Sequence, residues 1–302
     1  MAAPLQPGTV VNSRYRITRF LGSGAFGAVY LGMDLREKGA VWALKEVLGE
    51  GMEPGEKREV LESFRNEAAI LTALSHRGIP RFTDYFITGG RGYLVMERVE
   101  GLTLEDIVKN NKKPLNEREV AGWAIQLCDT LEYLHRHDPP IIFRDLKPQN
   151  IMLTMEERVV LIDFGISRFY CPGKDTDTIP LGTPGYSPPE QYGRSQTTPA
   201  SDLYSLATTL YYLLTLQDMA SFQFRYPPVR AFNSGVSQGM EHLLAKCMAW
   251  DTKERYQSAA QVRGILCELT GKPSENGSMK KYGVFLKEIR LESLFPFRRE
   301  KR

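Results

Sequence analysis

The chain has 302 residues, enough for two closely joined lobes that share a substantial hydrophobic core. Its 39 basic and 36 acidic side chains give a formal net charge of +3, and 42% of the residues are hydrophobic and 25% are charged. These values are typical of a globular protein, exclude a disordered or collagen-like chain, and give no electrostatic reason to expect a nucleic-acid partner.

Neither a membrane segment nor a disulfide framework is predicted. The longest uncharged stretch with helical character, residues 203–217, has 15 residues. A membrane-spanning helix needs roughly 20 apolar residues, so we expect a buried core helix and no transmembrane segment. The first residues, Met1–Pro4, resemble neither a signal peptide nor a myristoylation site. The four cysteines form no Cys-x-x-Cys pair, which favours a reduced, cytoplasmic location.

The first hundred residues have mostly strand character. Five short segments are β-branched or alternate between apolar and polar residues, with turn residues at their ends: 16–21, 28–31, 41–47, 81–88 and 93–98. One helix is predicted between the third and fourth strands, over about residues 57–74, because apolar residues recur there every three or four positions. We therefore expect a small five-stranded antiparallel sheet with one helix.

From residue 101 onwards the pattern becomes helical. Apolar residues recur at helical spacing over 120–134, 240–248 and 262–269. Between the first two of these segments lie a short strand pair, near residues 151–162, and a long polar loop, residues 165–190. We expect a second, larger lobe that is mostly helical.

The composition changes again after residue 270. Residues 271–302 contain nine basic and four acidic residues, a net charge of +5, so the preceding residues carry −2 of the total of +3. Apolar residues such as Val284, Leu286, Ile289 and Leu294 alternate with the basic ones. This tail is suited to docking on the larger lobe, to contacting a partner or anionic lipid, or to remaining a solvated end.

Residues 22–27, Gly-Ser-Gly-Ala-Phe-Gly, match the pattern G-x-G-x-x-G, which has several interpretations. A P-loop requires Lys followed by Ser or Thr after the last glycine, but Ala28 and Val29 follow here. A dinucleotide-binding turn requires a helix at the glycines, whereas residues 28–31 have strand character. A glycine hairpin that closes over nucleotide phosphates and a structural turn without a ligand both remain open.

Lys45 and Glu67 form a candidate pair. Lys45 lies on the third strand, where its cation can reach an α- or β-phosphate of a nucleotide. Glu67 falls on the apolar face of the helix, and a carboxylate is costly to bury there unless it is paired. We therefore expect an ion pair that aims the lysine at the nucleotide, although a lone lysine on a strand is more often a solvated residue.

Two motifs supply the groups that phosphoryl transfer from a nucleotide requires. They are Phe-Arg-Asp-Leu-Lys-Pro-Gln-Asn, which ends at Asn150, and Asp-Phe-Gly, which begins at Asp163. Asp145 can accept the proton of the attacking hydroxyl, and Lys147 can offset charge on the transferred phosphate. Asn150 and Asp163 provide the sparse oxygen ligands that Mg²⁺ favours when phosphate and water complete its shell.

With these motifs in this order, residues 15–270 resemble the catalytic domain of eukaryotic-type protein kinases, in a form similar to bacterial members. The segment Gly182–Glu190 resembles the peptide-positioning and Ala-Pro-Glu region of that family. The resemblance implies an α+β, bilobal protein-kinase-like fold, with an N-lobe over about 15–98, a C-lobe over about 99–270 and a basic tail over 271–302. It also implies a protein serine/threonine kinase that transfers the ATP γ-phosphoryl group to Ser/Thr hydroxyls of proteins, including itself.

The resemblance assigns roles to particular residues and implies ATP and Mg²⁺ as cofactors. The catalytic residues are expected to be Asp145, Lys147, Lys45, Glu67 and Thr183. The metal ligands are expected to be Asn150 and Asp163. The residues expected to bind the nucleotide are Leu21, Gly22, Ser23, Gly24, Ala25, Phe26, Gly27, Val29, Ala43, Lys45, Met96, Glu97 and Val99.

Four further expectations follow from the resemblance. Asp202 is expected to cap the buried helix, and Arg255 is expected to pair with Glu190. Phe143 stands where the family usually has a histidine, and we expect this difference to change packing and not the chemistry. Lys147, two positions after Asp145, is typical of serine/threonine kinases.

Arg144, which the family uses to bind a phosphorylated activation loop, is retained. A phosphate adds about two negative charges for this arginine to neutralise. Thr176 and Thr178 are the candidate phosphorylation sites, and the alternative is that both are solvated loop residues.

Two other functional classes remain as alternatives. A pseudokinase that binds nucleotide without turnover would lack Lys45, Asp145 or Asp163, and all three are present. A small-molecule kinase of related fold is disfavoured by the segment Gly182–Glu190. The expected partners are protein substrates and a transient dimer for autophosphorylation, with no nucleic acid.

Overall fold

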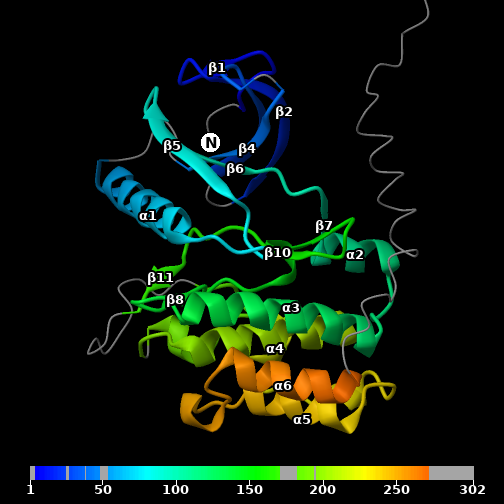
Figure 1. The fold of residues 1–302 in the computed structure, drawn as a ribbon. Helices are drawn as coiled ribbons and strands as arrows, with labels where there is room; N and C mark the ends of the chain where they lie inside the picture. The colour runs from blue at the N-terminus through cyan, green and yellow to red at the C-terminus, as the bar shows by residue number, and fades with distance from the viewer. Residues whose placement is uncertain are drawn as a thin grey trace, which may run out of the picture.

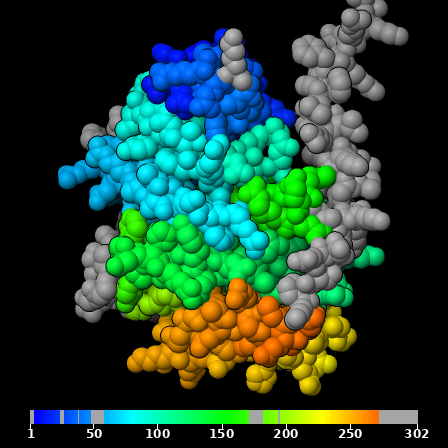
Figure 2. Space-filling view, viewed as in Figure 1, coloured from blue at the N-terminus to red at the C-terminus, as the bar shows by residue number. Residues whose placement is uncertain are grey.

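The computed structural model describes residues 4–24, 27–37, 39–47, 54–170, 182–193 and 195–271. Figure 1 shows a curled sheet with one helix beside it at one end of the molecule and a larger group of helices at the other. The N-terminal strands, blue in Figure 2, and helix α6 (Ala259–Thr270), orange, lie at opposite ends. This is the two-lobed α+β arrangement that the sequence predicts.

The smaller lobe contains a six-stranded antiparallel sheet. In the order in which they pair, its strands are β1 (Val10–Val11), β2 (Tyr15–Gly24), β3 (Gly27–Asp34), β4 (Val41–Glu46), β6 (Arg91–Glu97) and β5 (Phe82–Thr88). The five predicted strands are all present, and the two-residue β1 adds a sixth at the edge. Large side chains such as Tyr15, Tyr30, Trp42 and Leu44 pack in a hydrophobic cluster made by residues of the sheet.

Helix α1 (Pro54–Ala73) contacts β5 and β6 and begins three residues before the predicted helix. Phe64, Ala68 and Leu71 are buried, as their spacing predicts, and they join a second hydrophobic cluster that also contains residues of the larger lobe. Burying a large apolar side chain contributes about 1.5–3 kcal/mol, so this face fixes the helix in place. Glu67 lies on the same face and is only 2% exposed.

The larger lobe is mostly helical, as predicted. In chain order its helices are α2 (Leu104–Asn111), α3 (Glu117–His135), α4 (Pro199–Thr215), α5 (Gln238–Cys247) and α6. Short 3₁₀ turns lie between them: η1 (Pro148–Asn150), η2 (Pro189–Tyr192), η3 (Met219–Phe222), η4 (Val229–Ala231) and η5 (Thr252–Glu254). The lobe also has two small antiparallel sheets. One contains β7 (Gly101–Thr103), β9 (Ile151–Thr154) and β10 (Val159–Leu161), and the other contains β8 (Ile141–Ile142) and β11 (Arg168–Phe169).

Most of the long uncharged stretch, residues 203–217, lies in helix α4. Nearly all of its residues are buried, and it packs against α3 and α5. The predicted core helix is therefore confirmed. Across the described ranges, no helix has both the length and the apolar character that crossing a bilayer requires.

Candidate functional site

The glycine motif forms a hairpin between two strands. Strand β2 ends at Gly24, β3 begins at Gly27, and these two glycines are paired across the turn. Ala25 and Phe26, at the tip, lie outside the described residues. Because a strand and not a helix follows the motif, the P-loop and dinucleotide-binding interpretations are excluded. A hairpin that closes over phosphates and a turn without a ligand are the two interpretations that this geometry fits.

Gly27 is required where β3 passes β4. Its φ is +143°, and a Cβ atom there would lie 1.7 Å from the carbonyl oxygen of Glu46. Gly27→Ala is therefore expected to lower the free energy of unfolding by about 2 kcal/mol and to weaken nucleotide binding, because the hairpin must shift. Urea unfolding and nucleotide titration measure these effects.

Gly22→Ala is the matched control, because it lies in the same hairpin and a Cβ atom added there meets nothing within 4 Å. We expect it to change the free energy of unfolding by less than about 1 kcal/mol. Equal losses in the two variants would contradict the assignment of the effect to the contact with Glu46.

Lys45, Glu67 and Asp163 meet between the sheet, α1 and the larger lobe. The Nζ atom of Lys45 lies 2.7 Å from Glu67 Oε1 and 2.6 Å from Asp163 Oδ1. Lys45 is on β4, Glu67 is on the buried face of α1, and Asp163 follows β10 by two residues. The predicted pair of Lys45 and Glu67 is present. The lysine also contacts the carboxylate of Asp163, which was predicted only as a metal ligand.

Burial and charge oppose each other in this group of three. Burial acts to lower the pKa of Lys45, but the two carboxylates outweigh it and the net pKa is raised. Burial has the largest effect on Glu67 and raises the pKa of its carboxyl, even with Lys45 beside it. Burial also acts to raise the pKa of Asp163, but the charge and hydrogen bond of Lys45 lower it below its usual value. The cation of Lys45 thus compensates the buried carboxyl of Glu67 and the partly exposed carboxyl of Asp163.

Lys45→Met is expected to make the stability of the protein depend on pH. Without the cation, Glu67 is buried beside Asp163, so its pKa in the folded state rises further above the ordinary value of 4.5. The folded state then binds this proton more tightly than the unfolded state. The contribution of Glu67 to the stability of the variant is therefore fully present below about pH 4.5 and is lost as the pH rises through the folded pKa. Each added pKa unit corresponds to about 1.4 kcal/mol.

Urea unfolding of Lys45→Met and of the wild type at a series of pH values from 5 to 8 measures this effect. The stability deficit of the variant should grow with increasing pH. Arg98→Met, which breaks an exposed pair with Glu100 just after β6, is the control and should show little pH trend. A deficit of Lys45→Met that is the same at every pH would contradict the role given to Glu67.

A second group of side chains surrounds Asp145, which is 6% exposed. Its Oδ1 atom accepts a hydrogen bond from Thr183 Oγ1 at 2.9 Å, and its Oδ2 atom accepts one from Asn150 Nδ2 at 2.7 Å. Lys147 Nζ lies 2.9 Å from Asp145 Oδ2 and donates to Thr183 Oγ1, also at 2.9 Å. The structure therefore brings three other predicted site residues, Thr183, Asn150 and Lys147, into contact with the carboxylate of Asp145.

Asp202 holds the loop 143–150 and does not cap its own helix. The N-cap residue of α4 is Thr198, which forms a capping box with the first turn. The carboxylate of Asp202 instead accepts the backbone amides of Phe143, at 3.0 Å, and Arg144, at 2.8 Å. The expectation that Asp202 caps α4 is wrong, because Thr198 already satisfies the start of the helix.

Phe143 occupies its position through packing. Its side chain is fully buried, and its ring meets the ring of Phe164 edge to face, with centroids 5.0 Å apart. The Oγ atom of Ser167 donates to the Phe143 carbonyl at 3.0 Å. The difference from the usual histidine therefore changes packing next to Asp163, and the contacts of Asp145 are complete without an imidazole at this position.

The predicted ion pair between Glu190 and Arg255 anchors the segment 182–193, which contains Thr183. Arg255 donates from Nη1 and Nη2 to the two carboxylate oxygens of Glu190, at 2.7 and 3.0 Å, and both side chains are almost completely buried. Thr176 and Thr178 lie outside the described residues, so their assignment as phosphorylation sites stays a prediction.

The other residues predicted to bind the nucleotide lie on the strands of the sheet or just after it. They are Leu21 on β2, Val29 on β3, Ala43 on β4, Met96 and Glu97 on β6, and Val99 two residues later. The register places Val29 opposite Lys45 and Ala43 opposite Met96. The positions are therefore on neighbouring strands, next to Lys45 and the glycine hairpin.

Some contacts near the site could not be found from sequence. Glu97 Oε1 pairs with Arg158 Nη2 at 2.9 Å, which connects the end of β6 with the larger lobe. Asn66 Nδ2, on α1, donates to the carbonyl of Ser167 at 2.9 Å. The partners are 61 and 101 residues apart, and no local pattern in the sequence indicates either contact.

Asn150 and Asp163 have the donor chemistry expected of magnesium ligands. The amide nitrogen of Asn150 donates to Asp145, which leaves the amide oxygen as the atom that can ligate. The backbone amide of Ile162 donates to the Asn150 carbonyl at 2.9 Å, so the two candidates come from adjacent segments. Within the described part of the chain, His, Cys, Asp and Glu side chains form no group of three or more that could hold a metal. Two oxygen ligands completed by phosphate fit Mg²⁺.

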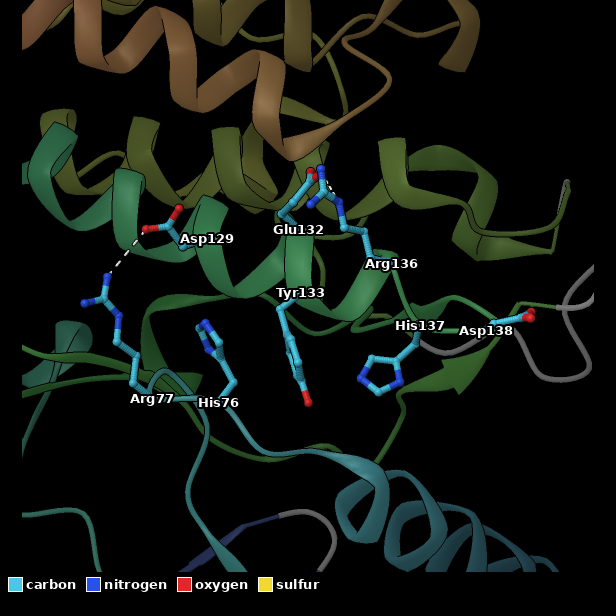
Figure 3. A pocket seen from close by; sticks show the side chains of 8 residues that line it. All are labelled: His76, Arg77, Asp129, Glu132, Tyr133, Arg136, His137 and Asp138. Atoms are coloured by element: carbon cyan, nitrogen blue, oxygen red, sulfur yellow. Dashed lines mark ion pairs between the residues drawn. The ribbon is translucent and has the colours of Figure 1, made fainter.

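A hollow of about 610 Å³ on another face shares no residue with this site. Figure 3 shows that its walls come from helix α3, from the residues that directly follow it and from the segment with His76 and Arg77, and that the ring of Tyr133 lies between His76 and His137. Four of its charged side chains form two ion pairs: Arg77 with Asp129 at 3.5 Å, and Arg136 with Glu132 at 2.8 Å. The hollow is therefore not a candidate for the chemistry that the motifs indicate.

Comparisons with known proteins agree with this geometry. The sequence model of a family described as "Protein kinase domain" matches residues 15–264. A protein of Nostoc sp., named serine/threonine-protein kinase PknA, is 39% identical over 216 residues, which are 68% of this chain and 38% of that protein. A probable serine/threonine-protein kinase PknB of Lactococcus lactis is 31% identical over 270 residues, 85% of this chain and 42% of that protein. PknB of Mycobacterium tuberculosis is 31% identical over 286 residues, 88% of this chain and 44% of that protein. The chain spans about two fifths of the length of these curated relatives.

Proposed function

Because the chain belongs to the protein kinase family, we propose that it transfers the γ-phosphoryl group of ATP to serine and threonine hydroxyls of proteins, including its own. The observation that carries this proposal is the arrangement around Asp145. A buried carboxylate meets a threonine hydroxyl, a lysine ammonium and an amide in one place, with each contact at 2.7–2.9 Å. The carboxylate, the ammonium and the amide oxygen, which can ligate Mg²⁺, are groups that phosphoryl transfer to an alcohol requires.

In the proposed reaction, Asp145 orients the substrate hydroxyl and accepts its proton. The hydroxyl oxygen forms a bond to the γ-phosphorus while the bond from that phosphorus to the β–γ bridging oxygen breaks, and ADP leaves with the electron pair. Lys147 offsets the charge on the transferred group, and its contact with Thr183 fixes the direction of its ammonium. The carboxylate, the cation and the hydroxyl therefore act as one unit.

Lys45 and Glu67 have the role of holding the nucleotide. Lys45 would bind the α- or β-phosphate, and Glu67, at 2.7 Å, keeps the ammonium in that direction. Asn150 and Asp163 would hold Mg²⁺, which supplies positive charge to the phosphates when it is bound. The glycine hairpin would cover the phosphates with its backbone amides, and Leu21, Val29, Ala43, Met96, Glu97 and Val99 would contact the base.

Several features outside the reaction belong to the same proposal. Arg144 would bind a phosphate on Thr176 or Thr178 and so stabilise the active arrangement. Autophosphorylation between two copies would need a transient dimer. The basic residues 271–302 would contact a partner or an anionic lipid surface, and the protein would act in the cytoplasm.

Incubation of the purified protein with γ-labelled ATP, Mg²⁺ and a generic protein substrate tests the proposal. Label on protein that acid hydrolysis recovers as phosphoserine or phosphothreonine is the expected result. Nucleotide binding without transfer would instead support a pseudokinase. Label found only on small molecules would support a small-molecule kinase, and either result would overturn the proposal.

A further inference from the structure

Two buried polar side chains outside the proposed catalytic group connect the segment 182–193 with the loop 143–150. Gln191 is fully buried, and its Nε2 atom donates to the Arg144 carbonyl at 2.9 Å and to Ser187 Oγ at 3.4 Å. Ser187 is 2% exposed, and its Oγ atom also accepts the backbone amide of Thr183 at 2.8 Å. One side-chain amide thus meets a backbone group of the loop and a hydroxyl of the segment.

Both connections end at Asp145. The Arg144 carbonyl belongs to the peptide unit that leads into Asp145, so its direction sets the direction of that residue. On the other path, Ser187 fixes the Thr183 amide, and the Thr183 hydroxyl donates to Asp145 Oδ1 at 2.9 Å. The position of the Gln191 amide therefore influences the proposed base through the backbone and through a hydrogen bond.

Gln191 is itself held firmly. It lies in the turn η2, directly after Glu190, whose carboxylate is bound by Arg255 and by Ser201 Oγ, the latter at 2.7 Å. The backbone amide of Arg144 donates to Asp202 at 2.8 Å, and the backbone carbonyl of Arg144 accepts from Gln191. The two side chains therefore fix both backbone groups of Arg144. Arg144 has a φ of +70°, an uncommon conformation that needs such support.

We propose that Gln191 and Ser187 are positioning residues for phosphoryl transfer, which place Thr183 and Asp145 for the reaction without touching the substrate. The inference rests on the proposed function and adds to it a connection from the anchored turn η2 to the base. A hydrogen-bond donor is required at position 191, because the Arg144 carbonyl and Ser187 Oγ both accept from the side chain there. An acceptor is required at position 187, because the Thr183 amide and the Gln191 side chain both donate to it.

Steady-state kinetics of the full chain tests the role of Gln191. Gln191→Met keeps an unbranched side chain of similar size and removes the donor. Its kcat is expected to fall about tenfold, as for a lost buried hydrogen bond, while the KM for ATP stays within about twofold. Gln126→Met is the matched control, because the amide of Gln126 donates to the Glu157 carbonyl at 2.9 Å and accepts the Val159 backbone amide at 3.0 Å, both outside the segments 143–150 and 182–193. Its kcat should equal that of the wild type.

A double-mutant cycle tests whether Ser187 acts through Thr183. Ser187→Ala is expected to lower kcat about tenfold in the wild-type background and less than about twofold in the Thr183→Ala background, because the group that it positions is then absent. Equal effects in the two backgrounds would show a merely structural role and overturn the inference. This cycle also decides the question if Gln191→Met fails to fold.

The two proposals fail in different ways. A wild-type protein that transfers no phosphate would contradict the proposed function. An active wild-type protein whose kcat is unchanged by both Gln191→Met and Ser187→Ala would contradict only the inference about positioning.

Discussion

Asp145→Asn is expected to lower the rate of phosphoryl transfer about a thousandfold. The amide has nearly the same size as the carboxylate, but it cannot accept the proton of the substrate hydroxyl, and general-base catalysis typically contributes 10²–10⁴ in rate. Nucleotide affinity should change little, because the contacts of Asp145 are to Thr183, Lys147 and Asn150. Initial rates with labelled ATP and a nucleotide titration measure the two effects.

Asp129→Asn is the control for this substitution. It makes the same chemical change on helix α3, where the carboxylate pairs with the exposed Arg77 and Arg263 and meets no residue of the site. Its transfer rate should stay within about twofold of the wild type. A rate for Asp145→Asn that remains above about a tenth of the wild-type rate would rule out the proton-accepting role.

Arg255→Ala is expected to lower the free energy of unfolding by about 3–5 kcal/mol. The Arg255 side chain is completely buried and that of Glu190 is 4% exposed, so removal of the cation leaves a carboxylate without compensation in the interior. The guanidinium also lies 4.7 Å from the ring centroid of Tyr204, and that contact is lost as well. Urea unfolding monitored by fluorescence measures the change.

Two further variants separate the charge from the packing. Arg263→Ala breaks a partly exposed pair with Asp129 and should cost less than about 1 kcal/mol. The double variant Glu190→Leu with Arg255→Met removes both charges and should recover part of the loss, because no unpaired ion remains. A cost for Arg255→Ala no greater than that for Arg263→Ala would contradict the explanation.

The parts of the site that depend on local pattern could be predicted from sequence. Strand character after Gly27 was enough to choose the hairpin over a helix-based anion site. The place of Glu67 on an apolar helix face was enough to predict its pairing with Lys45, since burial of a lone carboxylate is costly. The resemblance to a family then supplied the pair of Glu190 and Arg255, which are 65 residues apart.

The parts that depend on how distant segments meet could not be predicted. Asp202 was assigned to the start of α4, but Thr198 is near enough in sequence to take that role, and only the packed structure shows the loop amides at the carboxylate. The contact of Gln191 with the Arg144 carbonyl spans 47 residues and involves a backbone group, which has no signature in the sequence. The contact of Lys45 with Asp163 was missed because the two residues are 118 positions apart in the sequence.

Helix α1 and the strands differ in what they are packed against. Phe64, Ala68 and Leu71 share a hydrophobic cluster with the larger lobe, whereas most buried apolar side chains of the sheet form a cluster of their own. The 2.7 Å contact between Lys45, on a strand, and Glu67, on α1, therefore joins elements whose side chains belong mainly to different clusters. A shift of β4 relative to the helix by only about 1 Å takes this contact beyond hydrogen-bond distance. The ion pair therefore depends on the alignment of the sheet with α1 and, through α1, with the larger lobe.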